Sequence, residues 1–274
     1  MNRVHLQPAT EADLDAVWPS IRAARIFRRR TQLDEFHQAG PWRVRVAPGG
    51  RVALVERWRD ALGILAIRGL WCNGPETPAI LTDLKSVAAA QGYSEILSPL
   101  LAPEATVGYR QAGLQVAETL VAFRMDSHQA AALDPVLPEG VRLRQALPAD
   151  IPSLAALDRA CFEQFWAYEA WRLVDALVDD RLVVAAGDGG IIGYTLSTVD
   201  RGSGTIGRVA VHPDLRGRGI GAALLGDAAA GLAAAGAGMI TLCTQVHNHA
   251  ALTLYEGIGM RRMTGRLVLM TGSA

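Results

Sequence analysis

Hydrophobic and polar positions along the chain follow a scheme that occurs twice. The segment 4–14 (VHLQPATEADL) alternates as a strand, breaks, and then begins a helix at an Asp-containing cap. The segment 141–151 (VRLRQALPADI) repeats this pattern at an offset of 137 residues. Further along, 51–63 (RVALVERWRDALG) parallels 181–193 (RLVVAAGDGGIIG), and each predicts two strands joined by a tight turn. The chain is therefore expected to contain two copies of one α/β unit.

A third match carries the repeat to the end of each copy. The segment 253–260 (TLYEGIGM) parallels 107–114 (VGYRQAGL), so that Tyr255 corresponds to Tyr109. Between the paired strands and this tyrosine the second copy is the longer one, and most of the difference precedes its helix at 224–236. We therefore expect the first copy to keep the scaffold and to lack a loop that the second copy contains.

The order of elements predicts the fold class. Each copy reads as strand, helix pair, antiparallel strands, glycine loop or its remnant, helix, strand, helix and final strands. This order predicts a mixed α/β (α+β) fold of two tandem domains, each with a central mixed sheet flanked by helices. The segment 127–138 has two prolines and no strong period, and it is the expected linker between a first domain at 1–126 and a second at 139–274.

Composition narrows the class of protein. Half of the 274 residues are hydrophobic, which is enough for a well-buried core. The 27 basic residues balance 27 acidic ones, which argues against nucleic acid or a membrane surface as the main partner. The three cysteines are far apart and the first residues lack the apolar core of a secretory signal, so a cytoplasmic location is expected. The apolar stretch 222–240 contains Asp227 and glycines, and predicts a helix under a sheet rather than a membrane span.

The candidate chemistry lies in the stretch RVAVHPDLRGRGIGAALL (208–225). A β-branched run ends as a strand at Pro213, which cannot continue a ladder. The glycines that follow permit positive φ angles, and their N–H groups converge at the positive start of a helix. The stretch therefore predicts a cradle for a phosphate or a pyrophosphate. Its residues are Arg216, Gly217, Arg218, Gly219, Ile220 and Gly221.

Two nucleotide-binding motifs do not fit this spacing. A P-loop needs GK[ST] where the chain has Ala222 and Ala223, and the dinucleotide fingerprint needs GxGxxG. The pattern RGRGIG instead resembles the R/Q-x-x-G-x-G/A acetyl-CoA loop of the GNAT superfamily of acyl-CoA-dependent N-acetyltransferases. A second element, NHAALTLYEGIGM (248–260), is similar to the N-x-x-A-x-x-L-Y-x-x-x-G-F element of that family, with Met260 in place of the usual Phe. The two elements stand in the order of the family.

The resemblance implies how the second domain would hold acetyl-CoA. Backbone groups of Val209, Ala210 and Val211 would meet the pantetheine arm, with an N–H of Ala210 or Val211 facing the thioester oxygen. Residues 216–221 would hold the pyrophosphate, and Asn248 would lie beside the pantetheine. We expect no metal, because His247 and His249 have no third ligand at metal spacing.

The sequence predicts one residue as the general acid but leaves the proton acceptor open. Tyr255 would be the general acid, because a phenol can protonate the departing thiolate. Tyr109 has no loop in its own copy and is expected only to pack. Neither predicted central strand, TIGRVAV or MITLCTQV, carries a carboxylate, so the proton acceptor stays open among several groups and a water chain. These groups are Glu163, Glu169 and His247, with Gln245 where some relatives carry Glu.

The function implied is direct transfer of an acetyl group from acetyl-CoA to a primary amine, by a monomer or a homodimer. The acceptor would be a small-molecule amine or a peptide N-terminus. The tandem arrangement is similar to that of the mycothiol synthase family. The stretch FEQFW (162–166), within the aromatic segment 161–171 (CFEQFWAYEAW), is similar to protein N-terminal acetyltransferases of the ribosomal-protein type. That segment is expected either to shape the acceptor pocket or to pack a helix pair. An alternative of another class is an acyl-CoA sensor without turnover.

Overall fold

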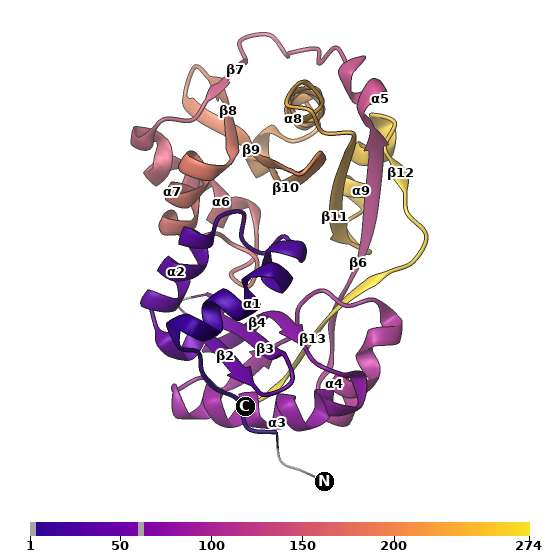
Figure 1. Cartoon of the computed structure of the whole chain (residues 1–274). Coiled ribbons are helices and arrows are strands. Elements are labelled where there is room, and N and C mark those ends of the chain that lie inside the picture. Colours follow the sequence, from indigo (N-terminus) through magenta and orange to yellow (C-terminus); the bar gives the residue numbers. More distant parts are fainter. Residues whose placement is uncertain (1–3, 60–62) are drawn as a thin grey trace. The chain divides into compact units, whose positions relative to one another are not determined.

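The chain forms two compact units, and the first of them also includes the last ten residues. The structure, a computed structural model, describes residues 4–59 and 63–274. Unit 1 comprises residues 1–120 and 265–274, and unit 2 comprises residues 121–264 (Figure 1). These units do not coincide with the contiguous segments 1–126 and 139–274, because the end of the chain returns to the sheet of unit 1.

The sheet of unit 1 has the strand order β1-β2-β3-β4-β5-β13-β6. Its strands are β1 (Gln7–Pro8), β2 (Val44–Ala47), β3 (Arg51–Arg57), β4 (Ile64–Trp71), β5 (Glu95–Leu97), β13 (Leu267–Ser273) and the first half of β6 (Gln115–Asp126). Its α-helices are α1 (Glu11–Ala23), α2 (Arg30–Gln38), α3 (Thr77–Ala90) and α4 (Val107–Gln111), with 3-10 turns at η1 (Pro41–Arg43), η2 (Gly74–Glu76) and η3 (Pro103–Thr106).

The two faces of this sheet are covered by different helix pairs. Side chains alternate along β3, so Val52 and Leu54 pack with α1 and α2, whereas Ala53 and Val55 pack with α3 and α4. The helix α1 begins at the predicted Asp-containing cap: Thr10 is the N-cap, and its side chain and that of Asp13 bond each other's backbone N–H.

The sheet of unit 2 has the strand order β7-β8-β9-β10-β11-β6-β12. Its strands are β7 (Arg142–Gln145), β8 (Arg181–Gly187), β9 (Gly190–Asp200), β10 (Ser203–Val211), β11 (Met239–Gln245), β12 (Arg261–Arg262) and the second half of β6. Its α-helices are α5 (Ser127–Ala131), α6 (Ile151–Cys161), α7 (Ala170–Asp179), α8 (Ile220–Ala234) and α9 (His249–Gly257), with 3-10 turns at η4 (Pro148–Asp150) and η5 (Pro213–Leu215).

The helix α8 covers one face of the unit 2 sheet, and α6 and α7 cover the other (Figure 1). Leu225 and Ala228 of α8 pack on Ile206 and Ile240, so the apolar stretch after residue 220 is the buried helix that the sequence predicts. Within the described ranges, no helix combines the length and the hydropathy that a membrane crossing needs.

The strand orders correct one part of the predicted repeat. By position in the two sheets, β3 corresponds to β9 and β4 to β10, so the match of 51–63 with 181–193 is displaced by one strand. Side chains alternate with a period of two residues in every strand, so a single sequence does not reveal such a displacement. Residues 60–62 of that match lie outside the described residues. The true difference between the copies is the connection before the helix: residues 72–76 in unit 1 and 212–219 in unit 2.

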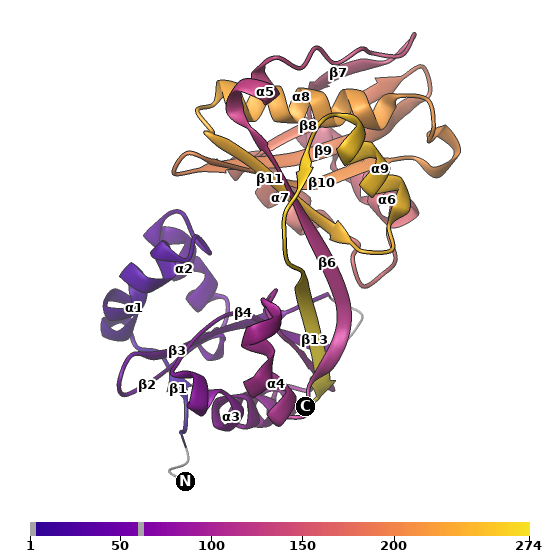
Figure 2. The same ribbon diagram turned by 90° about the vertical axis from the view of Figure 1, so that its right-hand side faces the viewer.

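The sheet of unit 1 is completed by a strand that follows unit 2 in the sequence. In unit 1, β13 lies between β5 and β6, with Thr271 opposite Leu97 and Leu267 opposite Leu120. The strand β6 then continues into unit 2, where Arg124 pairs with Arg261 of β12 (Figure 2). The same sheet position is thus filled by the last strand of the chain in unit 1 and by the middle of the chain in unit 2.

Candidate active site

The strands β10 and β11 of unit 2 begin as a parallel pair and then part. Their register covers only Ser203–Thr205 opposite Met239–Thr241. A β-bulge between Ile206 and Arg208 shifts the pairing of β10 with its other neighbour, β9. Bulges re-aim a strand and end regular pairing. The last residues of β10 therefore keep β9 as a partner on one edge and have no registered partner on the β11 edge, among the described residues.

The antiparallel pairing decides which backbone groups of β10 face this edge. His212 donates its N–H to the Ile192 carbonyl at 2.9 Å, and pairing with β9 alternates back along the strand. The N–H of Ala210 therefore points toward β9, and the backbone groups of Val209 and Val211 point to the open edge. Of the two amides expected to face a thioester oxygen, the geometry favours that of Val211.

The glycine loop ends in an uncapped helix N-terminus. Gly217 has φ +75° and Gly219, the N-cap of α8, has φ +82°, a backbone region that side chains disfavour. No side chain caps this helix, and the first intrahelical donor is the N–H of Ala223, to the Gly219 carbonyl at 3.0 Å. The preceding N–H groups at 220–222 are thus available to an anion, at the positive end of the helix dipole.

The two arginines of the loop are exposed, and one is held in place. The Nε of Arg216 donates to the Val211 carbonyl at 3.2 Å, and the Cys161 thiol donates to the same oxygen at 3.3 Å. Burial raises the pKa of that thiol, and Arg216 acts in the opposite direction. Arg218 instead lines a cavity.

A cavity of about 540 Å³ opens beside the loop, within unit 2. Its floor is the small-residue surface of α8, including Ala222 and Gly226. The segment 133–138 forms a wall, where Pro135 would lie 3.2 Å from a Cβ added at Gly226. Arg218 and Asp134 are its charged lining residues. The cavity is mostly apolar, and it adjoins the N–H groups that a phosphate would contact.

The helix α9 is fixed to the end of β11 by its N-cap. Asn248 accepts the N–H of Ala251 at 3.2 Å and donates its Nδ2 to the Thr244 hydroxyl at 3.2 Å. The Thr244 hydroxyl donates in turn to Oε1 of Gln245 at 3.3 Å. Asn248 therefore has a defined structural role as a helix cap. Its contact with a pantetheine arm stays a prediction.

Tyr255 lies on α9 and packs in the core between α8, α9 and β6. Its ring meets Phe123 edge-on, with centroids 5.5 Å apart, and only 8% of the residue is exposed. Burial raises the pKa of Tyr255 to about 12; the Cys243 thiol adds to the effect, whereas the hydrogen bond with Thr244 opposes it. The phenol is therefore protonated at neutral pH, as a general acid must be.

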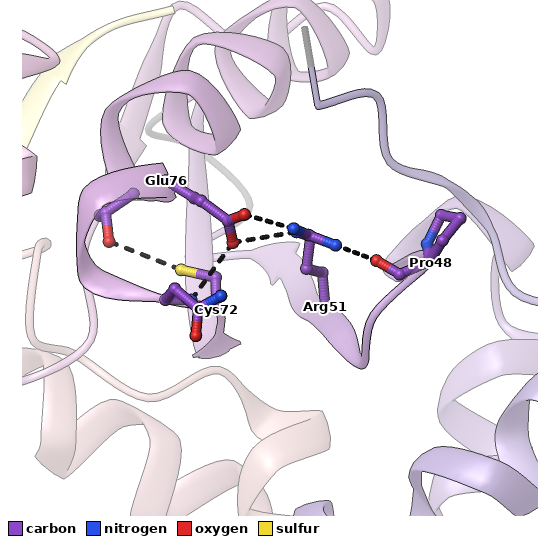
Figure 3. Close-up of polar contacts among 6 residues, drawn as sticks. Pro48, Arg51, Cys72 and Glu76 are labelled. Carbon is purple, nitrogen blue, oxygen red and sulfur yellow. Dashed lines mark hydrogen bonds and ion pairs between the residues drawn. The ribbon is translucent and has the colours of Figure 1, made fainter. Parts of the chain in front are cut away.

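Unit 1 has a tyrosine in the equivalent place but a different connection before its helix. Tyr109 is buried on α4, and burial raises its pKa as well. At the start of α3 stands Glu76, which forms an ion pair with Arg51; Arg51 also donates to the Pro48 carbonyl (Figure 3). The Arg51 Nε and the Glu76 carboxylate are 2.9 Å apart.

The connection in unit 1 is unsuited to a pyrophosphate for three reasons. Glu76 puts a carboxylate at the N-cap of α3, and Pro78 removes one N–H from the first turn. The Cys72 sulfur lies 3.5 Å from the Thr77 hydroxyl (Figure 3), so side chains occupy the turn. In unit 1, a shorter turn with an acidic residue thus stands in the place of the glycine loop of unit 2.

A buried polar cluster escaped the sequence analysis. Asp158 of α6 pairs with Arg208 of β10, with 3.1 Å between Oδ2 and Nε, and accepts a short hydrogen bond from the Tyr194 hydroxyl. A signal existed: Asp158 falls on the apolar stripe of α6 with Leu154 and Ala155, where a lone carboxylate needs a partner. Asp158 is fully buried.

The comparisons with known proteins fit this geometry. Residues 151–260 match the model of the Acetyltransferase (GNAT) family. A GCN5-related N-acetyltransferase from Sphaerobacter thermophilus is 19% identical, with a TM-score of 0.70, over 100% of this chain and 96% of its own. A tandem GNAT protein from the clavulanic acid biosynthesis pathway is 13% identical, with a TM-score of 0.71, over 98% and 97%. No curated protein matches the chain significantly.

A third structure is similar over part of its own length. A glucosamine N-acetyltransferase region in a fungal multi-domain GH3 beta-N-acetylglucosaminidase is 14% identical, with a TM-score of 0.68, over 97% of this chain and 38% of its own. The fold and the matched segment define an acyltransferase. Residues 151–260 are thus similar to a GNAT acetyltransferase domain, and the mixed α/β fold of the chain has the tandem form that the sequence predicts.

Proposed function

We propose that unit 2 binds acetyl-CoA and transfers the acetyl group directly to a primary amine. The observation that carries the proposal is the continuity between the open edge of β10 and the uncapped N-terminus of α8, which Gly217 and Gly219 connect through positive φ angles. Unit 1 is proposed to be a degenerate copy that binds no coenzyme, because an acidic turn replaces its loop.

Different groups of unit 2 would bind the pyrophosphate, the pantetheine arm and the nucleotide of the coenzyme. The N–H groups at 220–222 and the two loop arginines would hold the pyrophosphate. The backbone of Val209 and Val211 would pair with the pantetheine arm in place of a neighbouring strand. The cavity floored by α8 would receive the nucleotide end, where Arg218 offers a cation to its phosphate.

The chemistry needs an oxyanion donor and an acid. The neutral amine nitrogen attacks the thioester carbon, and the N–H of Val211 would stabilise the charge that develops on oxygen. As the carbon–sulfur bond breaks, Tyr255 would give its proton to the sulfur. The amine loses a proton to water or to one of the groups left open above, and the phenol regains one from solvent.

The acceptor class follows from two similarities. One structural neighbour is named as a glucosamine N-acetyltransferase region, and the aromatic segment is similar to protein N-terminal acetyltransferases. Amino sugars and peptide N-termini are therefore the first acceptors to test. Both offer a primary amine that is partly neutral near pH 8.

The test is thiol release from acetyl-CoA in the presence of glucosamine, a glycine-terminated peptide, and simple primary amines. We expect release that depends on one of these acceptors and an acetylated product of matching mass. The control is the double variant Gly217→Val and Gly219→Val, which should lose coenzyme binding and turnover together. Tight binding of coenzyme A without acceptor-dependent release across the panel would refute transfer and favour an acyl-CoA sensor.

A further inference from the structure

The buried pair of Asp158 and Arg208 does more than connect a helix to a strand. Asp158 is fully buried, and only 9% of the Arg208 side chain is exposed. A buried ion pair adds little net stability over well-packed apolar residues, since both charges lose their hydration. Its retention in the core of unit 2 therefore calls for another consequence of its geometry.

Both members of the pair bind residues 162–168, which lie within the aromatic segment. The Arg208 Nη2 donates to the Trp166 carbonyl at 2.6 Å. The Arg208 guanidinium lies between two rings of the segment, 4.0 Å from the centroid of Phe162 and 3.7 Å from that of Tyr168. Asp158 accepts the backbone N–H of Tyr168 at 2.6 Å. The pair thus holds the segment through backbone and side chains.

The other end of this connection is the strand that would bind the thioester. Arg208 follows the β-bulge and directly precedes Val209. At the entrance to the aromatic segment, the Cys161 thiol donates to the Val211 carbonyl on the open edge of β10. The segment is therefore anchored to β10 at two points, at Arg208 and at Val211, which bracket Val209 and Ala210. A thioester held by Val209 and Val211 would therefore lie close to this segment.

We propose that Asp158 and Arg208 are positioning residues, which fix the aromatic segment as the wall of the acceptor site and so determine which amines bind. The proposal rests on the proposed function, because it presumes a thioester beside β10. The pair does not touch the reacting atoms. It acts by holding Phe162, Trp166 and Tyr168 at a set distance from the strand.

Single removal of one charge would leave the other buried and unpaired, and such a variant can fail to fold. The test therefore uses the double variant Asp158→Asn and Arg208→Met, which keeps an acceptor for the Tyr168 N–H and an apolar stem. Its matched control is Arg181→Met with Asp227→Asn, which removes another ion pair of unit 2, 2.8 Å long, between β8 and α8. Arg208→Lys is the conservative variant, since it keeps the charge but loses the planar stack.

The first measurement is limited digestion by chymotrypsin, which cuts after the aromatic residues of the segment. We expect cleavage within 162–168 to be at least tenfold faster in the double variant than in the wild type. The rate in Arg208→Lys should lie between these two, and the rate in the control should equal that of the wild type. Coenzyme A affinity by calorimetry should stay within about twofold in all variants. Cleavage of the segment at the wild-type rate in the double variant would overturn the proposal.

The second measurement uses whichever of glucosamine and the glycine-terminated peptide the wild type acetylates. In the double variant we expect the acceptor KM to rise at least tenfold while kcat changes less than threefold, with partial rescue in Arg208→Lys. Equal KM and kcat in the double variant and the wild type would overturn the proposal, because a merely structural pair changes thermal stability only. If the wild type acetylates neither of these, the KM is measured with whichever simple primary amine of the panel it acetylates; if it acetylates no amine of the panel, the proposed function fails, whereas the digestion still reports on positioning.

Discussion

The substitution Gly219→Ala tests whether the positive φ angles of the loop are needed for ligand binding or only for the stability of the fold. A natural control exists at the opposite end of the same helix, at Gly236. The two glycines have φ +82° and +87°. A Cβ at Gly219 would meet Pro138 at 3.7 Å, an ordinary contact, and one at Gly236 would meet nothing within 4 Å. Neither site is crowded, so the backbone conformation alone opposes alanine.

The loss of stability should be the same at both positions. A left-handed conformation costs a residue with a Cβ about 1–2 kcal/mol. Binding should differ, because only Gly219 precedes the N–H groups at 220–222. If the backbone relaxes away from positive φ there, these groups turn from the phosphate. One lost hydrogen bond to a charged group is worth roughly 1.5–3 kcal/mol, which is about a 10- to 150-fold loss of affinity.

Two measurements separate these effects. Urea denaturation should give equal shifts in midpoint for Gly219→Ala and Gly236→Ala, with an unchanged m-value. Calorimetric titration with coenzyme A should give weaker binding for Gly219→Ala and wild-type binding for Gly236→Ala. If both variants bind coenzyme A equally well, the N-terminus of α8 is not the pyrophosphate site and the proposed function loses its basis.

Other predictions concern the general acid Tyr255, the strand β13, coenzyme binding by unit 1 and the cavity beside the glycine loop. Tyr255→Phe should leave coenzyme A affinity nearly unchanged and lower turnover at least ~10-fold, whereas Tyr109→Phe should leave turnover unchanged in the same thiol-release assay. Since the pKa of Tyr255 is about 12, its phenol stays mostly protonated up to about pH 11, so the pH–rate profile should show no alkaline fall from this group below that pH. Deleting 265–274 removes three buried apolar side chains, each worth about 1.5–3 kcal/mol; hydrogen exchange should show unit 1 unprotected and unit 2 still folded. Calorimetry should give one coenzyme A per chain, and a second site would contradict the degenerate first unit. Asp134→Asn should bind coenzyme A roughly two- to fivefold more tightly at low salt, an effect that salt should remove.

The sequence predicted those features of the candidate site that depend on local geometry. The loop glycines, the helix that follows them and the positions of Asn248 and Tyr255 on α9 need only short-range pattern and spacing. Local pattern also predicted the Asp-containing cap of α1, because Thr10 and Asp13 are neighbours along the chain. These features are encoded within a few residues of one another.

What the sequence did not predict depends on pairing between distant segments. The strand β13 has an ordinary alternating pattern, and nothing within it specifies β5 and β6 as its neighbours. The ion pair of Asp158 with Arg208 spans 50 positions, and each residue alone is an unexplained charge in an apolar run. The displacement of the repeat by one strand has the same origin, since strands with the same period match one another in several registers.

The return of the last strand to the first unit has a consequence for protein synthesis. Residues 121–264 contain every strand of the sheet of unit 2, so this unit has all of its strands before residues 265–274 are added. The first part is made earlier but must wait, with the place between β5 and β6 unfilled, until residues 265–274 have left the exit tunnel. The half that is synthesised first is thus the half that finishes folding last.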